Sequence, residues 1–155
     1  MKVWVLFVLG AALSWGAYGP ALHYGRAQFP DKATASFRAL LCVGVAYFLV
    51  GVLVPLVALF LQGKLSGFTV RGSSFSTVAG VLGALGAVCI IWAFKSGGSP
   101  ISVMPLVFAG APMVNALITT LSHPDQTGKL DPKLYLGFAF AAVGAWMVLR
   151  YAPSA

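Results

Sequence analysis

Residues 93–120 read AFKSGGSPISVMPLVFAGAPMVNALITT. The second part of this stretch is apolar enough to cross a lipid bilayer, yet it contains Pro105, Pro112 and the amide of Asn115. A proline inside a helix removes a backbone hydrogen bond, which costs about 3 kcal/mol in a soluble helix. In lipid the freed carbonyl needs another partner, so the stretch predicts a broken helix that faces water or a ligand. The alternative is that both prolines only bend the helix for packing.

The same stretch contains the end of one helix and the start of the next. Gly97-Gly98 permits a tight reversal of the chain after an apolar run. Ser99-Pro100 then favours a new helix, because a hydroxyl caps the helix and proline suits its first position. Asp131-Pro132 repeats this pattern before the last apolar run. We therefore expect an antiparallel hairpin of two helices around the two glycines.

The composition indicates a membrane protein. The chain has 155 residues, of which 59% are hydrophobic and only 8% are charged, whereas soluble domains are about 25% charged. Four apolar runs have the length that a span needs, about 17–25 residues, and the fifth is short unless Arg150 reaches the headgroups. The sequence predicts an all-α integral membrane protein with a single membrane domain over residues 1–155. Its five transmembrane helices are expected at 3–25, 38–62, 74–94, 101–121 and 134–151.

Several classes of function are disfavoured by what the sequence contains. The net charge is +7, but the Lys and Arg residues stand singly between apolar runs and form no basic patch for nucleic acid. The apolar runs hold no carboxylate, no Cys/His cluster and no phosphate-binding glycine motif, so we expect no enzyme activity, metal or cofactor. Cys42 and Cys89 lie inside apolar runs and are expected to be buried rather than disulfide-bonded.

The charge distribution does not select one orientation in the membrane. An excess of Lys and Arg normally marks the cytoplasmic side, but five spans leave five such residues on each side. Either Lys2 and the first span decide the orientation, or the chain inserts both ways and pairs antiparallel. The two sets are Lys2, Lys64, Arg71, Lys129 and Lys133 on one side, and Arg26, Lys32, Arg38, Lys95 and Arg150 on the other.

The beginning of the chain allows a second interpretation. Met1-Lys2, an apolar stretch and Ala12-Leu13-Ser14 fit a secretory signal peptide. The apolar character continues well beyond Ser14, which favours a span. We expect a multi-pass protein of the cell membrane, meaning the inner or plasma membrane.

A family resemblance rests on short motifs spread along most of the chain. They are Leu13-Ser14-Trp15-Gly16, Ala93-Phe94-Lys95, the turn 96–100, Pro105 and Pro112, and Gly137 and Gly144 in the last run. With these motifs the chain resembles one EamA-like repeat of the drug/metabolite transporter superfamily, a five-helix unit. Most family members contain two such repeats in inverted orientation. The family usually has a Glu between its fourth and fifth helices, whereas this chain has Ser122-His123-Pro124-Asp125-Gln126 and no Glu.

The resemblance implies a transporter of small solutes or metabolites that works as a dimer of half-size units. The partner would be a second copy, in an antiparallel homodimer, or another half-transporter. One alternative is a membrane scaffold or accessory subunit that transports nothing. Another is half of a flippase for lipid-linked substrates. The identity of the small-molecule substrate is not indicated.

The residues expected to line a substrate cavity come from three of the runs. Pro105 and Pro112 point the same way to within about 20° at 100° per residue, with Ala109 near their stripe and Asn115 beside it. The first run adds a polar and aromatic wall of Ser14, Trp15 and Tyr18, with His23 as a proton-relay candidate. Lys95 would attract anionic solutes at the cavity mouth.

Each of these candidates has a competing role. An amide inside a span, such as Asn115, also bonds between helices. Aromatic residues, His23 and Lys95 near span ends also serve as interfacial anchors. The sequence leaves both roles open.

Small residues at four-residue spacing predict close helix packing. They form two stripes, and we expect the stripe in the last run to mediate contacts between copies. The stripes are Ala79, Gly83 and Ala87 in the third run and Gly137, Ala141 and Ala145 in the last.

Overall fold

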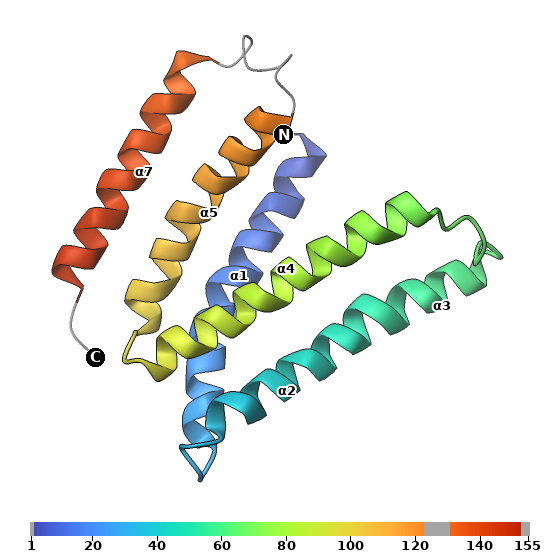
Figure 1. Ribbon diagram of the computed structural model, residues 1–155, viewed down its shortest axis with the longest axis horizontal. Helices are drawn as coiled ribbons and strands as arrows, with labels where there is room; N and C mark the ends of the chain where they lie inside the picture. Colours follow the sequence, from blue (N-terminus) through green and yellow to red (C-terminus); the bar gives the residue numbers. More distant parts are fainter. Residues whose placement is uncertain (1, 123–130, 153–155) are drawn as a thin grey trace. The chain divides into compact units, whose positions relative to one another are not determined.

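The computed structural model describes residues 2–122 and 131–152, and every regular element within these ranges is a helix. Five of the described helical stretches are long and apolar enough to cross a membrane, which confirms that the five apolar runs form long helices. The elements in chain order are α1 (Val3–Gln28), α2 (Ala35–Phe48), η1 (Leu49–Leu53), α3 (Val54–Leu61), α4 (Val70–Lys95), α5 (Pro100–Ser122) and α7 (Pro132–Tyr151) (Figure 1).

Capping groups decide where several helices begin and end. The Thr69 hydroxyl accepts a hydrogen bond from the Gly72 amide at 3.1 Å, so α4 begins at Val70, four residues before the predicted start. Gly97 follows α4 with φ of 95°, the left-handed conformation that glycine adopts freely. The Asp131 carboxylate accepts from the Lys133 amide at 2.9 Å and caps α7, as predicted.

The second span contains a π-helical turn that the sequence analysis did not predict. α2, η1 and α3 follow one another without a break as one rod (Figure 1). The Val54 amide donates to the Leu49 carbonyl, five residues back. Pro55 has no amide hydrogen, and its ring would crowd the carbonyl of residue 51 in a regular helix. The wider turn relieves this clash.

The chain divides into two compact units. One contains the residues up to Gly19 and those from Gly97 onward, and the other contains Pro20–Ser96. The first boundary lies inside α1, directly before Pro20, whose missing amide hydrogen interrupts the helical hydrogen bonds. The second boundary lies in the turn after α4.

In the first unit, α5 packs along α7, and the two helices lie side by side (Figure 1). The first part of α1 also reaches α5 in this unit, where Gly19 is buried against Met104. Met104 is only 4% exposed. The absence of a side chain at Gly19 therefore allows the two helices to approach closely.

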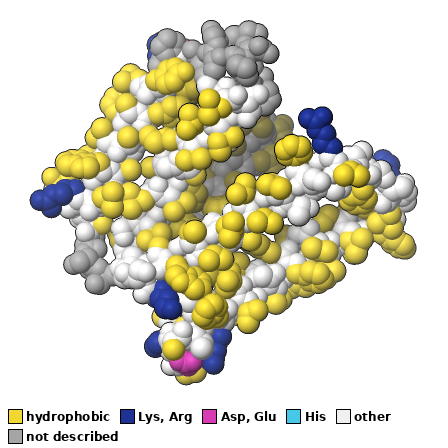
Figure 2. All heavy atoms as spheres, in the orientation of Figure 1, with side chains coloured by type: hydrophobic (Ala, Val, Ile, Leu, Met, Phe, Trp, Pro, Cys, Tyr) yellow, Lys and Arg dark blue, Asp and Glu magenta, His cyan; other side chains and the backbone are white. Residues whose placement is uncertain are grey.

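In the second unit, α2 packs on α4, and the buried side chains gather near the start of α2 and the end of α4. Small side chains of α2 meet larger ones of α4, and Ile91 is completely buried. Away from this cluster, nearly all residues of both helices are exposed, and apolar side chains are spread widely over the visible surface (Figure 2). The buried residues of this unit are Leu22, Ala35, Ser36, Ala39, Ala87, Ile90, Ile91 and Phe94.

The two small-residue stripes have different surroundings. On α4, Ala87 is buried in the second unit, while Ala79 and Gly83 are exposed. On α7, Ala141 and Ala145 are half-buried and Gly137 is exposed. The expectation that Cys42 and Cys89 are buried was wrong, because both thiols are free and exposed on the apolar outside of their helices.

Candidate solute site

Aromatic rings meet where the first part of α1 approaches α5. The rings of Trp15 and Tyr18 have centroids 6.2 Å apart, and Trp15 meets Phe108 edge-on at 6.4 Å. Tyr18 is half-buried, and Ser14 is exposed on the same helix. The structure therefore brings together the predicted Trp15 and Tyr18, and it adds Phe108.

Two contact pairs define the register of this crossing. Trp15 lies against Phe108, and Gly19, one turn further along α1, lies against Met104, one turn back along α5. The two helices are therefore antiparallel. Asn115 follows Phe108 by seven residues, which places it within about 20° of the same stripe of α5. Its side chain is exposed.

Helix α5 has two faces of different chemistry. Pro105 and Pro112 lie on a face of small and polar residues, and both prolines are exposed while Ala109 is half-buried. By helical periodicity, this face lies between the stripe that meets α1 and the stripe that meets α7. The opposite face carries bulky aliphatic side chains, namely Val103, Val107, Val114, Ile118 and Leu121.

A cavity of about 440 Å³ lies between α5 and α7, next to the proline face rather than on it. Its lining is almost entirely apolar, with Thr120 and Tyr135 as the residues that carry hydroxyl groups. None of the predicted cavity residues contributes to this lining. The residues that do are Met113, Ala116, Leu117, Thr120, Leu134, Tyr135, Phe138, Ala139 and Ala142.

Two predicted residues, His23 and Lys95, belong to the second unit. The His23 ring meets the Phe94 ring edge-on at 5.2 Å, and His23 Nδ1 is buried with no hydrogen-bond partner among the described residues. The Lys95 Nζ atom lies 5.7 Å from the centre of the Trp92 ring, a cation–π geometry at the end of α4. Lys95 itself is exposed.

Arg26, which the sequence analysis did not select as a site residue, links α1 to the end of α4. Its Nη2 atom donates to the Phe94 carbonyl at 3.0 Å, and its Nε is buried without a partner in the described ranges. A cation at a helix C-terminus is favourable, because the last carbonyls carry partial negative charge. The three-residue spacing from His23 was the signal for this contact, since such residues share a helix face.

Met104, Phe108 and Gly19 were also missed by the sequence analysis. Met104 and Phe108 are four residues apart on α5, and Trp15 and Gly19 are four apart on α1, so each pair shares a helix face. Nothing in the sequence says which stripe of α5 meets α1. The segment 122–126, where the family usually has its Glu, lies outside the described residues from position 123 onward.

Comparison with known proteins identifies no relative of the chain. No family model matches the chain, and no curated protein or solved structure matches it significantly. The function is therefore inferred from the residues and geometry given above.

Proposed function

We propose that the chain is a multi-pass membrane protein and one half of a small-solute transporter, resembling a single EamA-like repeat. The exposure of its apolar side chains supports membrane insertion. Val70 is 87% exposed, Leu61 77% and Phe7 75%. Soluble monomers rarely expose contiguous apolar patches of more than a few hundred Å². In a bilayer the same surface faces acyl chains at no such cost.

The observation that carries the transport proposal is the two-faced character of α5. Its bulky face suits lipid, whereas Pro105 and Pro112 lie on the small and polar side, with Asn115 flanking them. Each proline leaves a carbonyl one turn earlier without its helical donor. Free carbonyls and an amide inside a membrane are tolerated where they line a water-filled cavity. We therefore assign this face to a solute pathway.

The pathway would be completed by a second subunit. Both prolines and Asn115 are exposed, so no described segment of the first unit covers them. A partner placed over this face would shield it from lipid and leave a solvated gap. The partner is a second copy in our proposal, inserted antiparallel, as the balanced Lys and Arg count allows. A different half-transporter would fit the same face.

In this proposal the aromatic pair Trp15 and Tyr18 borders the pathway on α1, next to Phe108. Aromatic rings offer an apolar wall, and the freed carbonyls of α5 offer hydrogen-bond acceptors. A small solute with hydrogen-bond donors would suit this combination.

Thiol accessibility tests the pathway. The native Cys42 and Cys89 are first replaced by Ala, and single cysteines are placed at 105, 109, 112 and 115. We expect these four to react in membranes with a water-soluble thiol reagent. Matched cysteines at Val107 and Val114, on the opposite face, should stay protected by lipid. Uptake by the purified chain in liposomes, across a panel of metabolites, then tests transport directly.

Equal protection of both faces would contradict the pathway and favour a non-transporting scaffold. One observation supports that second candidate, since Ala79 and Gly83 of α4 are exposed and free to pack against another protein's helix. In a scaffold, cysteines at 105 and 112 would not react with the water-soluble thiol reagent, and α4 would contact other proteins.

A further inference from the structure

The second unit has an apolar groove along α2 that the proposed function does not use. The groove has a volume of about 550 Å³. It extends from Phe37 to Phe48, which is about 17 Å at 1.5 Å per residue. This length is close to half of the hydrocarbon core, which is about 30 Å thick. Its lining residues are Phe37, Leu40, Leu41, Gly44, Val45 and Phe48.

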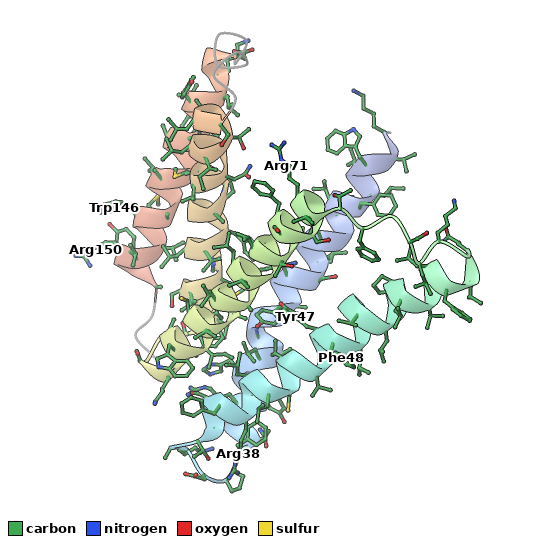
Figure 3. The ribbon with its side chains drawn as sticks, turned by 45° about the vertical axis from the view of Figure 1, so that its right-hand side comes forward. Arg38, Tyr47, Phe48, Arg71, Trp146 and Arg150 are labelled. Atoms are coloured by element: carbon green, nitrogen blue, oxygen red, sulfur yellow. The ribbon has the colours of Figure 1, made fainter. Side chains whose placement is uncertain are left out.

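A basic and aromatic cluster adjoins one end of the groove. The Phe37 ring meets the Trp92 ring edge-on at 5.3 Å, and Lys95 Nζ lies 5.7 Å from the centre of the Trp92 ring. Arg38 follows Phe37 in the chain and is exposed, and it lies at the same end of α2 in Figure 3, with Phe48 further along the helix. The charged groups and the groove are thus continuous.

The charge at this end of the unit is strongly positive. Four basic residues, Arg26, Lys32, Arg38 and Lys95, fall here against one acid, Asp31, and Lys and Arg side chains gather at this end in Figure 2. Lys32 is engaged, because its Nζ donates to two carbonyls at the end of α1. Arg38 and Lys95 have no hydrogen bond or ion pair within 4 Å to the described residues. Arg38 lies close enough to Asp31 to help lower the pKa of that carboxyl group, and its donors are left for an anion.

We propose that this groove and cluster bind one anionic phospholipid of the bilayer. The phosphate lies between Arg38 and Lys95, and an acyl chain follows the groove past Gly44 towards Phe48. A headgroup with net negative charge matches the cluster, and the length of the groove matches the thickness of one leaflet. The proposal requires the helices to lie in a bilayer, but it does not depend on transport.

Native mass spectrometry of the purified full chain in detergent tests the proposal. Phosphatidylglycerol and phosphatidylcholine with identical acyl chains are titrated separately. We expect the first to bind at least about fivefold more tightly, since each basic residue near a headgroup contributes a factor of that order. Arg38→Gln and Lys95→Gln should each lower the affinity for phosphatidylglycerol about fivefold and leave the affinity for phosphatidylcholine unchanged. Arg71→Gln, at the start of α4, is the matched control and should change neither.

The groove is tested by filling it. A Cβ added at Gly44 meets nothing within 4 Å, so a side chain can begin there unobstructed. Gly44→Leu should fill the groove and weaken the binding of both lipids several-fold. Gly80→Leu on α4, which is equally unobstructed, is its control. Soluble glycerol phosphate, a headgroup without a tail, should not displace the lipid.

Three results would overturn the assignment. The first is equal affinity of the unaltered chain for both lipids. The second is displacement by glycerol phosphate, which would leave an anion site without a role for the groove. The third is a change of oligomeric state in Gly44→Leu with lipid binding intact, which would make the groove an interface between copies. Circular dichroism of each variant checks that its helices form.

Discussion

Gly19 of α1 lies directly against the side chain of Met104 of α5. A Cβ atom built on Gly19 would come within 2.3 Å of Met104 Cγ and 2.7 Å of its Sδ, distances that packed atoms do not adopt. Met104 is almost completely buried, so it has little room to move aside. This glycine therefore fixes how closely the two helices pack.

Gly19→Ala should lower the free energy of unfolding by about 1–3 kcal/mol, because it overpacks the crossing. Gly16→Ala, one turn earlier on α1, meets nothing within 4 Å. That control should raise stability by up to about 1 kcal/mol through helix propensity. Denaturant titration in detergent, followed by circular dichroism, measures both variants.

A double-mutant cycle identifies the contact itself. In the presence of Met104→Ala, the cost of Gly19→Ala should shrink, with a coupling of about 0.5–3 kcal/mol. Additive effects of the two substitutions would show that the clash does not involve Met104.

Ser36 should tolerate, and benefit from, loss of its hydroxyl group. The side chain is 1% exposed, and its Oγ has no hydrogen-bond partner within the described part of the chain. Ser36→Ala removes a buried polar group without a partner, so it should raise the free energy of unfolding by about 1 kcal/mol. Thermal denaturation in detergent measures the change.

Ser76→Ala, at an exposed position of α4, is the control and should stay within about 0.5 kcal/mol. A destabilised Ser36→Ala would contradict the prediction, because it would mean that the hydroxyl is bonded.

Asp31 should titrate below its usual range. Its carboxylate accepts hydrogen bonds from the Thr34 hydroxyl and from the Ala33 amide, and these bonds hold its pKa below 3.8. The bonds favour the charged form, so their stabilising effect is present above about pH 3.8 and is lost as the pH falls through the lowered pKa. Thr34→Val removes the largest contribution and should return the pKa towards 3.8.

Carbon-13 NMR of labelled aspartate follows this titration. Thr77→Val, at an exposed position of α4, should leave Asp31 unchanged. An Asp31 that titrates at or above 3.8 in the unaltered chain would disprove the hydrogen-bond arrangement.

Ala141→Leu should weaken self-association about tenfold, equivalent to about 1.4 kcal/mol, if α7 mediates contacts between copies. The added side chain would hold the small-residue stripe away from its partner. Ala142 lines the cavity beside α5, so Ala142→Leu is the control and should leave association unchanged. Crosslinking in membranes compares the two variants, and unchanged crosslinking in Ala141→Leu would exclude this face.

The sequence predicted the helices well and their ends less well. Apolar runs mark the part of a helix that suits lipid, whereas a helix continues until its backbone groups find other partners. Thr69 begins α4 ahead of its apolar run, and α1 continues through polar residues to Gln28. The helix starts at Ser99-Pro100 and Asp131-Pro132 were predicted correctly, because local turn chemistry rather than hydropathy marks them. Asp131 makes the predicted capping bond, whereas the Ser99 hydroxyl lies 2.9 Å from that of Ser102.

The candidate site could be predicted only where one helix determines it. Trp15 and Tyr18 are three residues apart on α1, so their proximity follows from helix geometry. That Phe108 is the neighbour of Trp15 depends on which stripe of α5 faces α1. Gly19 determines this packing because it has no side chain, and a hydropathy pattern does not show that property. The α5–α7 cavity was missed for the same reason, since its lining comes from two helices.

The π-helical turn at Leu49–Leu53 separates the second span into two independent surfaces. The turn holds one residue more than a regular helical turn, so the residues after it are shifted by about 100° from the helical repeat of α2, and the groove along α2 stops at Phe48 and does not continue onto α3. Deleting one residue between 49 and 53 would therefore convert the turn into a regular α-helical one and leave the neighbours of both α2 and α3 in place, whereas a deletion within α2 would turn everything after it by about 100°.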